Sequence, residues 1–237
     1  MTTVQGWNTV AENPLVLVTE YSFGGGDANA MAVALPNDKI LIMSPPCGAP
    51  PATLDALKDL GTVVALIETN GAHHMGLGEC QRVFGEAKIY APESAAARIR
   101  KKGKDFGDLE PLSALEPLLG DKVSVIPMLG EKIGDVIVRV ETEKGTLLYA
   151  GDPIVNFNEA PGGFPFNLIF KWTNSAPGFK VNRIFFRLFV RDRKAMRDFL
   201  IREVETHPPA IIVPAHGAVV EQSNLGPTVG DMLRAAI

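Results

Sequence analysis

The chain has 237 residues, of which 46% are hydrophobic and 21% are charged, and its formal net charge is −4. This length and composition suit one large globular domain or two small ones, and we predict a single domain over residues 1–237. The mildly acidic balance gives no global basic field that points to nucleic acid or to an anionic membrane. Cys47 and Cys80 are too few for a disulfide framework, and no apolar run reaches the length of a membrane span. We therefore predict a cytoplasmic protein with reduced thiols.

The first half of the chain alternates short apolar strands with helical patterns. Strands are predicted at residues 14–19, 30–35, 39–43, 62–67 and 88–90, and helices at 52–60, 79–84 and 93–101. The glycine-rich turn Gly24-Gly25-Gly26 separates the first two strands, and a loop rich in proline and glycine follows the third.

The second half adds a further set of strands and closes with helices. Strands are predicted at residues 123–126, 136–141, 146–150 and 210–213, and helices at 194–206 and from about residue 228. Lys144-Gly145 is a plausible hairpin turn between two of these strands. Mixed strands with interspersed helices indicate a layered α/β domain.

One segment, at about residues 157–192, differs in composition from the rest. Eight of the twelve phenylalanines lie between Phe157 and Phe189, together with Trp172 and several basic residues. It is either an insertion that packs a small core of its own or an aromatic lid, a lipid-facing patch or a surface for homo-oligomer formation. The sequence leaves these interpretations open.

The histidine pair His73-His74 is the most informative local feature. It lies in the loop after the strand at 62–67, and imidazole is the commonest metal ligand in proteins. A rigid strand end followed by a loop is a place where a fold can direct such side chains into a shared site.

Three other residues of metal-ligand type follow strands or occupy glycine-framed turns. Asp152 follows a strand and a glycine, His216 lies in a Pro-Ala-His-Gly turn, and Glu131 lies between two glycines. Taken singly, Asp152 could organise a turn, His216 could be structural and Glu131 could be a solvated charge. Asn29 could support such a site, whereas His207 is expected to be a residue at the C-terminus of a helix.

The order of these features resembles the metallo-β-lactamase fold superfamily. The resemblance covers about residues 16–220, and its best-matched pieces are His74-Met75-Gly76, Tyr149-Ala150-Gly151-Asp152 and Pro214-Ala215-His216-Gly217. It implies a four-layer αββα sandwich whose strand-end loops gather metal ligands at one edge.

The signature loop of that superfamily, H-x-H-x-D-H, is altered here. With His74 at the last position, His73 stands at the aspartate, while Thr69 and Gly71 stand where two histidines are expected. The chain therefore resembles a diverged branch with an Asn-x-x-His-His motif that begins at Asn70.

The remaining matches define the predicted ligand set. Glu131 stands at the histidine of a Pro-Gly-His-Thr loop, Asp152 matches the aspartate that bridges two metals, and His216 matches the late histidine. The resemblance implies one divalent metal rather than two, with ligands drawn from His73, His74, Glu131, Asp152 and His216.

These ligand types suit zinc, which we expect, and also iron or manganese. A catalytic metal lowers the pKa of a bound water to about 7, and Glu131 or His73 would accept the proton. With Asp152, these are the residues expected to be catalytic. The resemblance implies a small-molecule substrate: an ester, lactone, thioester, amide or phosphodiester. Two alternatives are a catalytically inactive binding protein and a non-haem iron oxidoreductase.

Overall fold

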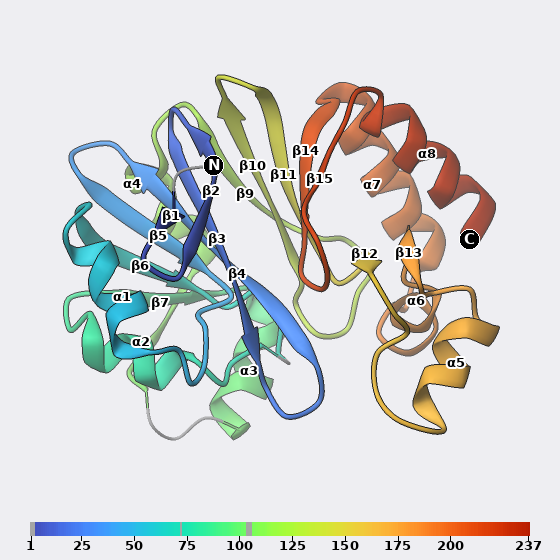
Figure 1. Ribbon diagram of the computed structural model, residues 1–237, viewed down its shortest axis with the longest axis horizontal. Helices are drawn as coiled ribbons and strands as arrows, with labels where there is room; N and C mark the ends of the chain where they lie inside the picture. The colour runs from blue at the N-terminus through green and yellow to red at the C-terminus, as the bar shows by residue number, and fades with distance from the viewer. Residues whose placement is uncertain (1–2, 72, 103–105) are drawn as a thin grey trace.

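The computed structural model describes residues 3–71, 73–102 and 106–237 (Figure 1). Its first sheet has eight strands in chain order: β1 (Thr3–Val4), β2 (Trp7–Glu12), β3 (Leu15–Ser22), β4 (Asp27–Leu35), β5 (Lys39–Met43), β6 (Thr62–Ile67), β7 (Lys88–Ala91) and β8 (Leu109–Pro111). Neighbours from β1 to β5 are antiparallel, and neighbours from β5 to β8 are parallel. The parallel connections pass through α1 (Pro51–Lys58), α2 (Leu77–Val83) and α3 (Glu93–Lys102).

The second sheet has five strands in the order β15, β14, β11, β10, β9. These are β9 (Val123–Pro127), β10 (Val136–Thr142), β11 (Gly145–Gly151), β14 (Pro209–Pro214) and β15 (Val220–Glu221). A 3₁₀ turn (Leu112–Leu115) and α4 (Glu116–Leu119) lead into β9, while α7 (Arg193–Thr206) and α8 (Leu225–Ala236) follow later in the chain. The predicted turn at Lys144-Gly145 joins β10 to β11, as their register shows.

Alternation along the strands explains why the two sheets stack between helices. In β4, Met31 and Val33 belong to the apolar cluster between the sheets, whereas Ala30 and Ala32 face the cluster formed with α1, α2 and α3. Successive side chains of a strand point to opposite faces, so a strand that is apolar at every position is buried on both sides.

A third apolar cluster packs the outer face of the second sheet against α7 and α8, with Leu200 and Leu233 among its buried members. The order of layers is therefore helices, sheet, sheet, helices, as Figure 1 shows from left to right. The predicted four-layer αββα sandwich is confirmed.

The segment 157–192 contributes secondary structure that the sequence pattern did not predict. β12 (Ile154–Phe157) and β13 (Gly178–Val181) form a two-stranded sheet, and α5 (Phe166–Trp172) and α6 (Arg183–Leu188) accompany it. Phe185 and Phe186 are buried in the third cluster with α7 and α8, so these phenylalanines join the main core and do not form a separate one.

The N-terminal strands β1 and β2 were also not predicted. Their hairpin depends on contacts with distant residues: the Trp7 indole, which is fully buried, donates a hydrogen bond to the Thr53 carbonyl at 2.8 Å. Within the described part of the chain, no helix combines the length and the hydropathy needed to cross a membrane.

Candidate metal centre

Three side chains of metal-ligand type converge at one edge of the two sheets. The Nε2 atoms of His73 and His216 lie 3.4 Å and 3.1 Å from the same oxygen, Oδ1 of Asp152. The ligand atoms of all three residues lie within 4.8 Å of one another, and the two imidazole centroids are 5.2 Å apart. His73 and Asp152 are buried, and His216 is partly buried. Two imidazoles and one carboxylate form a donor set that suits zinc and other divalent transition metals.

The three residues meet because their strands end side by side. β11 and β14 are parallel, and Gly151 pairs with Pro214 at their carboxyl ends. The amide of Ala215 then donates to the Gly151 carbonyl at 3.1 Å, which holds the residues before Asp152 and His216 together. His73 reaches the same edge from the loop after β6 in the other sheet.

His216 is held in one tautomer by the backbone. Its Nδ1 lies 2.6 Å from the carbonyl oxygen of Asp27, which can only accept a hydrogen bond, so Nδ1 carries the hydrogen. In the neutral ring, Nε2 then presents a lone pair towards Asp152. Burial lowers the pKa of His216, but Asp152 and the Asp27 carbonyl outweigh burial and raise its pKa above the ordinary value.

Asn29, which the sequence suggested as a supporting residue, braces the backbone on both sides of His216. Its Nδ2 donates to the Pro214 carbonyl at 2.9 Å and to the Gly217 carbonyl at 2.7 Å, and its amide donates to Ala215 at 2.8 Å. This bracing fixes the ring position through the main chain.

His73 is oriented by two hydroxyl groups. Its Nδ1 lies 3.0 Å from the Ser44 hydroxyl and 3.5 Å from the Tyr21 hydroxyl, and these two hydroxyls are 2.9 Å apart. Ser44 directly follows β5 with a φ of 49°, and its hydroxyl therefore lies next to the loop that carries His73. Hydrogen bonds to the outer nitrogen orient a ligand imidazole and leave Nε2 directed at the cation.

Asp152 is the centre of the group. Its Oδ2 accepts a hydrogen bond from Asn70 Nδ2 at 2.9 Å, whereas Oδ1 makes no hydrogen bond of good geometry with any described residue. Burial raises the pKa of Asp152, but the imidazoles of His73 and His216 outweigh burial and hold its pKa well below the usual range. An ionised, buried oxygen that two imidazole nitrogens face without hydrogen-bond geometry fits a bound cation.

The structure does not bring Glu131 into this group. Its carboxylate accepts hydrogen bonds from the amides of Ile133 and Gly134 within its own turn, and Ser94 Oγ lies 3.4 Å away. The turn itself pairs with Val190 of the aromatic segment. A carboxylate that accepts hydrogen bonds from the amides of its own turn organises that turn, so Glu131 is neither a member of the group nor the solvated charge that the sequence left open for it.

His74 also lies outside the group of three, although it is adjacent to His73. It is partly buried, and its carbonyl accepts a hydrogen bond from Leu77 at the start of α2. Of the two imidazoles, that of His73 forms the group with Asp152 and His216 among the described residues. His207, as expected, is the C-terminal cap of α7, with its amide bonded to Glu203.

Two buried carboxyl groups beside the site were not identified from the sequence. Asp135 is fully buried, and its Oδ2 accepts a hydrogen bond from the amide of Asp152 at 3.3 Å. Glu68 is also fully buried, and neither of its carboxyl oxygens makes a hydrogen bond of good geometry with a described residue. Burial raises the pKa of each group well above its usual range. Only the position of Glu68 at the end of an apolar strand could have indicated its burial.

A cavity of about 220 Å³ opens beside the group and gives it access from outside. Asp152 and His216 form part of its wall, and most of the remainder is apolar or aromatic. The Phe157 ring stacks on the His216 ring at 5.9 Å, and Phe23 lies against it at 6.0 Å. The lining residues are Phe23, Gly25, Gly26, Asp27, Asp152, Phe157, Pro161, Phe170, Asn182, Ile184, Phe185, Phe189 and His216.

No family model matches the chain, and no curated protein matches it in sequence. Solved structures match it in three dimensions. The mono-zinc form of the metallo-β-lactamase FIM-1 from Pseudomonas aeruginosa has a TM-score of 0.61 at 12% identity, covering 97% of this chain and 95% of that chain. A metallo-β-lactamase from Pontibacter korlensis has a TM-score of 0.56 at 14% identity, covering 96% and 98%.

A metal-soaked Flv1 flavodiiron core from Synechocystis sp. PCC6803 is also similar, with a TM-score of 0.57 at 14% identity over 96% of this chain and 60% of that chain. These neighbours establish that the chain has the metallo-β-lactamase fold, as the sequence features predicted. Sequence identities this low support the fold alone, so the chemistry has to be inferred from the site itself.

Proposed function

We propose that this protein is a metal-dependent hydrolase with a mononuclear centre formed by His73 Nε2, Asp152 Oδ1 and His216 Nε2. The observation that carries the proposal is the convergence of both Nε2 atoms on one buried carboxylate oxygen that makes no hydrogen bond of good geometry with a described residue. Three protein ligands with an open side are the pattern of a catalytic zinc site, and zinc is the metal we propose. A cation held there would acidify a water molecule and polarise a carbonyl group.

The surrounding residues hold the ligands in place. The Asp27 carbonyl holds the Nδ1 hydrogen of His216, Ser44 contacts Nδ1 of His73, and Asn70 fixes Oδ2 of Asp152. Each of these contacts leaves the inward-facing ligand atom free to bind. Glu131 has no part in this centre, so we do not retain it as a ligand or proton acceptor.

The cavity favours a neutral, apolar substrate. Its lining includes two aspartates, five phenylalanines and no lysine or arginine, so an anionic group such as a phosphodiester would meet repulsion. Asn182 is the uncharged polar side chain of the lining. Its Oδ1 accepts from the Phe185 amide at the start of α6, which leaves its NH₂ group to donate to a substrate oxygen. We therefore propose an ester, lactone, thioester or amide with an apolar acyl or aryl group.

The test begins with metal analysis of protein purified without chelator. The proposal expects near-stoichiometric zinc in the wild type and in His74→Ala, and loss of metal in His216→Ala and Asp152→Ala. Hydrolysis of neutral aryl esters should follow metal content, and a substrate with a carboxylate on its acyl group should react more slowly. Metal-free wild-type protein with an intact fold would count against the proposal.

The same measurements separate the two alternatives. An inactive binding protein would show no metal-dependent turnover of any neutral ester. An iron oxidoreductase would contain iron after growth in iron-replete medium and would lose it in the same two variants, because two histidines and a carboxylate also bind Fe(II).

A further inference from the structure

The helix α5 and its flanks expose large apolar side chains. Trp172 is 85% exposed and Phe164 is 82% exposed, and α5 buries none of its seven residues. The exposed apolar residues of this segment are Phe164, Phe166, Leu168, Ile169, Trp172 and Leu188. Large exposed apolar groups gathered on one element mark a surface that meets another apolar phase or molecule.

Residues 160–191 of the same segment carry only positive charges. Between Glu159 and Asp192 there are five cations and no acidic residue, in a chain whose net charge is −4. The cations are Lys171, Lys180, Arg183, Arg187 and Arg191. The acidic balance of the whole chain therefore conceals one strongly basic segment.

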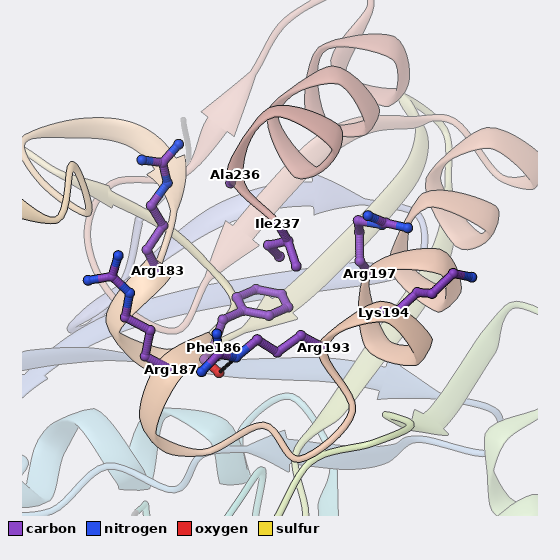
Figure 2. Close-up of a pocket in the computed structure, with 8 residues that line it drawn as sticks. All are labelled: Arg183, Phe186, Arg187, Arg193, Lys194, Arg197, Ala236 and Ile237. Atoms are coloured by element: carbon purple, nitrogen blue, oxygen red, sulfur yellow. Dashed lines mark hydrogen bonds between the residues drawn. The ribbon is translucent and has the colours of Figure 1, made fainter.

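Arg183 and Arg187 also line a basic cavity of about 350 Å³ between α6, α7 and the end of α8, which Figure 2 shows in close-up. Arg193, Lys194 and Arg197 complete its polar lining, which includes no acidic side chain. Lys194 and Arg197 form ion pairs with Asp198 outside the lining.

The other three arginines of the cavity have no acidic partner among the described residues. Arg193 Nε donates to the Phe186 carbonyl at 3.1 Å, and Arg183 Nη2 donates to the Ala235 carbonyl at 3.3 Å. Both contacts leave most of each guanidinium free for an anionic group. In Figure 1, α5, α6 and the adjacent end of α7 lie at the same end of the molecule.

We propose that this surface docks the protein on an anionic phospholipid membrane, with α5 in the interface and the basic cavity at the level of the headgroups. An exposed tryptophan and phenylalanines beside lysine and arginine, without acidic residues, form the pattern of an interfacial membrane-binding segment. The cations favour an anionic lipid surface over a neutral one, and over a two-fold symmetric dimer in which this basic surface would face itself.

The same segment also connects the surface with the candidate centre. Its inward side chains, among them Phe157, Phe170 and Phe185, line the cavity beside His216, while its outward side chains are exposed. Docking would place the mouth of that cavity at the membrane surface. The docking proposal itself does not depend on catalysis, because its test measures binding.

The test uses the full chain with vesicles of phosphatidylcholine alone or of phosphatidylcholine mixed with phosphatidylserine. The fluorescence of Trp172 reports binding at this surface, because the other tryptophan, Trp7, is fully buried. The proposal expects co-sedimentation and a blue shift of Trp172 fluorescence with the mixed vesicles, and both effects should weaken as salt is raised.

Two variants address the two parts of the surface. Phe164→Ser/Phe166→Ser should reduce partitioning at least about tenfold through lost apolar burial. Lys171→Glu/Arg187→Glu should reduce it more than about tenfold, because each cation near an anionic surface contributes about fivefold. The matched controls are Leu60→Ser, an exposed apolar residue after α1, and Lys101→Glu/Lys122→Glu, two exposed cations elsewhere. Both controls should bind like the wild type.

Three results would overturn the proposal. The first is absence of binding to the mixed vesicles by a folded wild-type protein. The second is equal binding to both kinds of vesicle that Lys171→Glu/Arg187→Glu does not weaken. The third is a wild-type dimer that becomes monomeric in Phe164→Ser/Phe166→Ser while neither binds vesicles, which would assign the surface to a homo-oligomer interface.

Discussion

The strand-end group around Asp152 and the segment around α5 differ in opposite ways from the usual burial of apolar and exposure of polar side chains. At the strand ends, polar and ionisable side chains are buried, including Glu68, Asp135 and Asp152. Around α5, large apolar side chains are exposed, including Phe164 and Trp172. Buried polar groups and exposed apolar patches are the informative exceptions to the usual distribution. Asp152 of the first region and Phe170 of α5 line the same aromatic cavity.

The two regions differ in what stabilises them. The buried polar groups are costly without partners, so the strand ends fix them by hydrogen bonds such as those of Asn70 and Ser44. The exposed apolar groups of α5 have little to hold them within the chain. Substitutions should therefore damage the first region and leave the fold unaffected in the second.

The largest effect should be the loss of zinc affinity when a member of the ligand group His73, Asp152 and His216 is removed. Asp152→Ala and His216→Ala should each weaken zinc affinity more than about a hundredfold, beyond the 10–100-fold typical of losing a residue that merely supports a ligand. Competition with a chromophoric chelator measures the affinity, with circular dichroism to check the fold. His74→Ala should bind zinc like the wild type; an equal loss in His74→Ala would show that the ligand set includes that residue.

The next effect concerns the backbone that carries His216. Gly217 has a φ of 90°, and a Cβ there would lie 2.0 Å from the carbonyl oxygen of Asn156. Gly217→Ala should therefore lower the free energy of unfolding by about 2–4 kcal/mol, and it should weaken zinc binding by displacing His216. Urea denaturation measures the first effect. Gly163→Ala is the matched control, because its Cβ would meet nothing within 4 Å; equal stabilities of the two variants would contradict the prediction.

Glu68 should make stability depend on pH. Burial raises the pKa of its carboxyl group, so the folded protein keeps the proton while the unfolded chain releases it above about pH 4.3. The associated stability is fully present below that pH and is lost as pH rises towards the folded pKa, by up to about 1.4 kcal/mol per pH unit.

Glu68→Gln cannot release a proton, so it should gain stability relative to the wild type as pH rises. Urea denaturation of both proteins from about pH 5 to pH 8 measures the difference. Glu116→Gln, at an exposed position, should show no such gain. A constant difference in the free energy of unfolding between Glu68→Gln and the wild type across this range would contradict the prediction.

The smallest effect is expected at α5. Phe164→Ser/Phe166→Ser/Trp172→Ser should change the free energy of unfolding by no more than about 0.5 kcal/mol per substitution, since these side chains are exposed. By contrast, Phe186→Ser in the third apolar cluster should cost about 3–5 kcal/mol. Thermal unfolding compares the two. Strong destabilisation of the triple variant would show that α5 packs against the rest of the chain.

Most of the sheet could be predicted because its strands carry their own pattern. The strand predicted at 62–67 matches β6, and the helix predicted at 194–206 nearly matches α7. The elements that were not predicted, such as β2 and α5, have mixed or short patterns. Long-range contacts stabilise β2, as the Trp7 bond to Thr53 shows, and a window of local sequence does not contain them.

The sequence by itself indicated a layered α/β domain, because strand periodicity is a local property of the chain. The order of its strand-end motifs supplied the resemblance that implied the αββα arrangement and the short list of residues that could bind a metal. Only the tertiary structure decided which of them meet. It directs His73, Asp152 and His216 to one point, and Glu131 to its own turn. The reason is geometric: side-chain direction in a loop depends on backbone angles and on contacts from the opposite sheet, which neighbouring residues in the sequence do not specify.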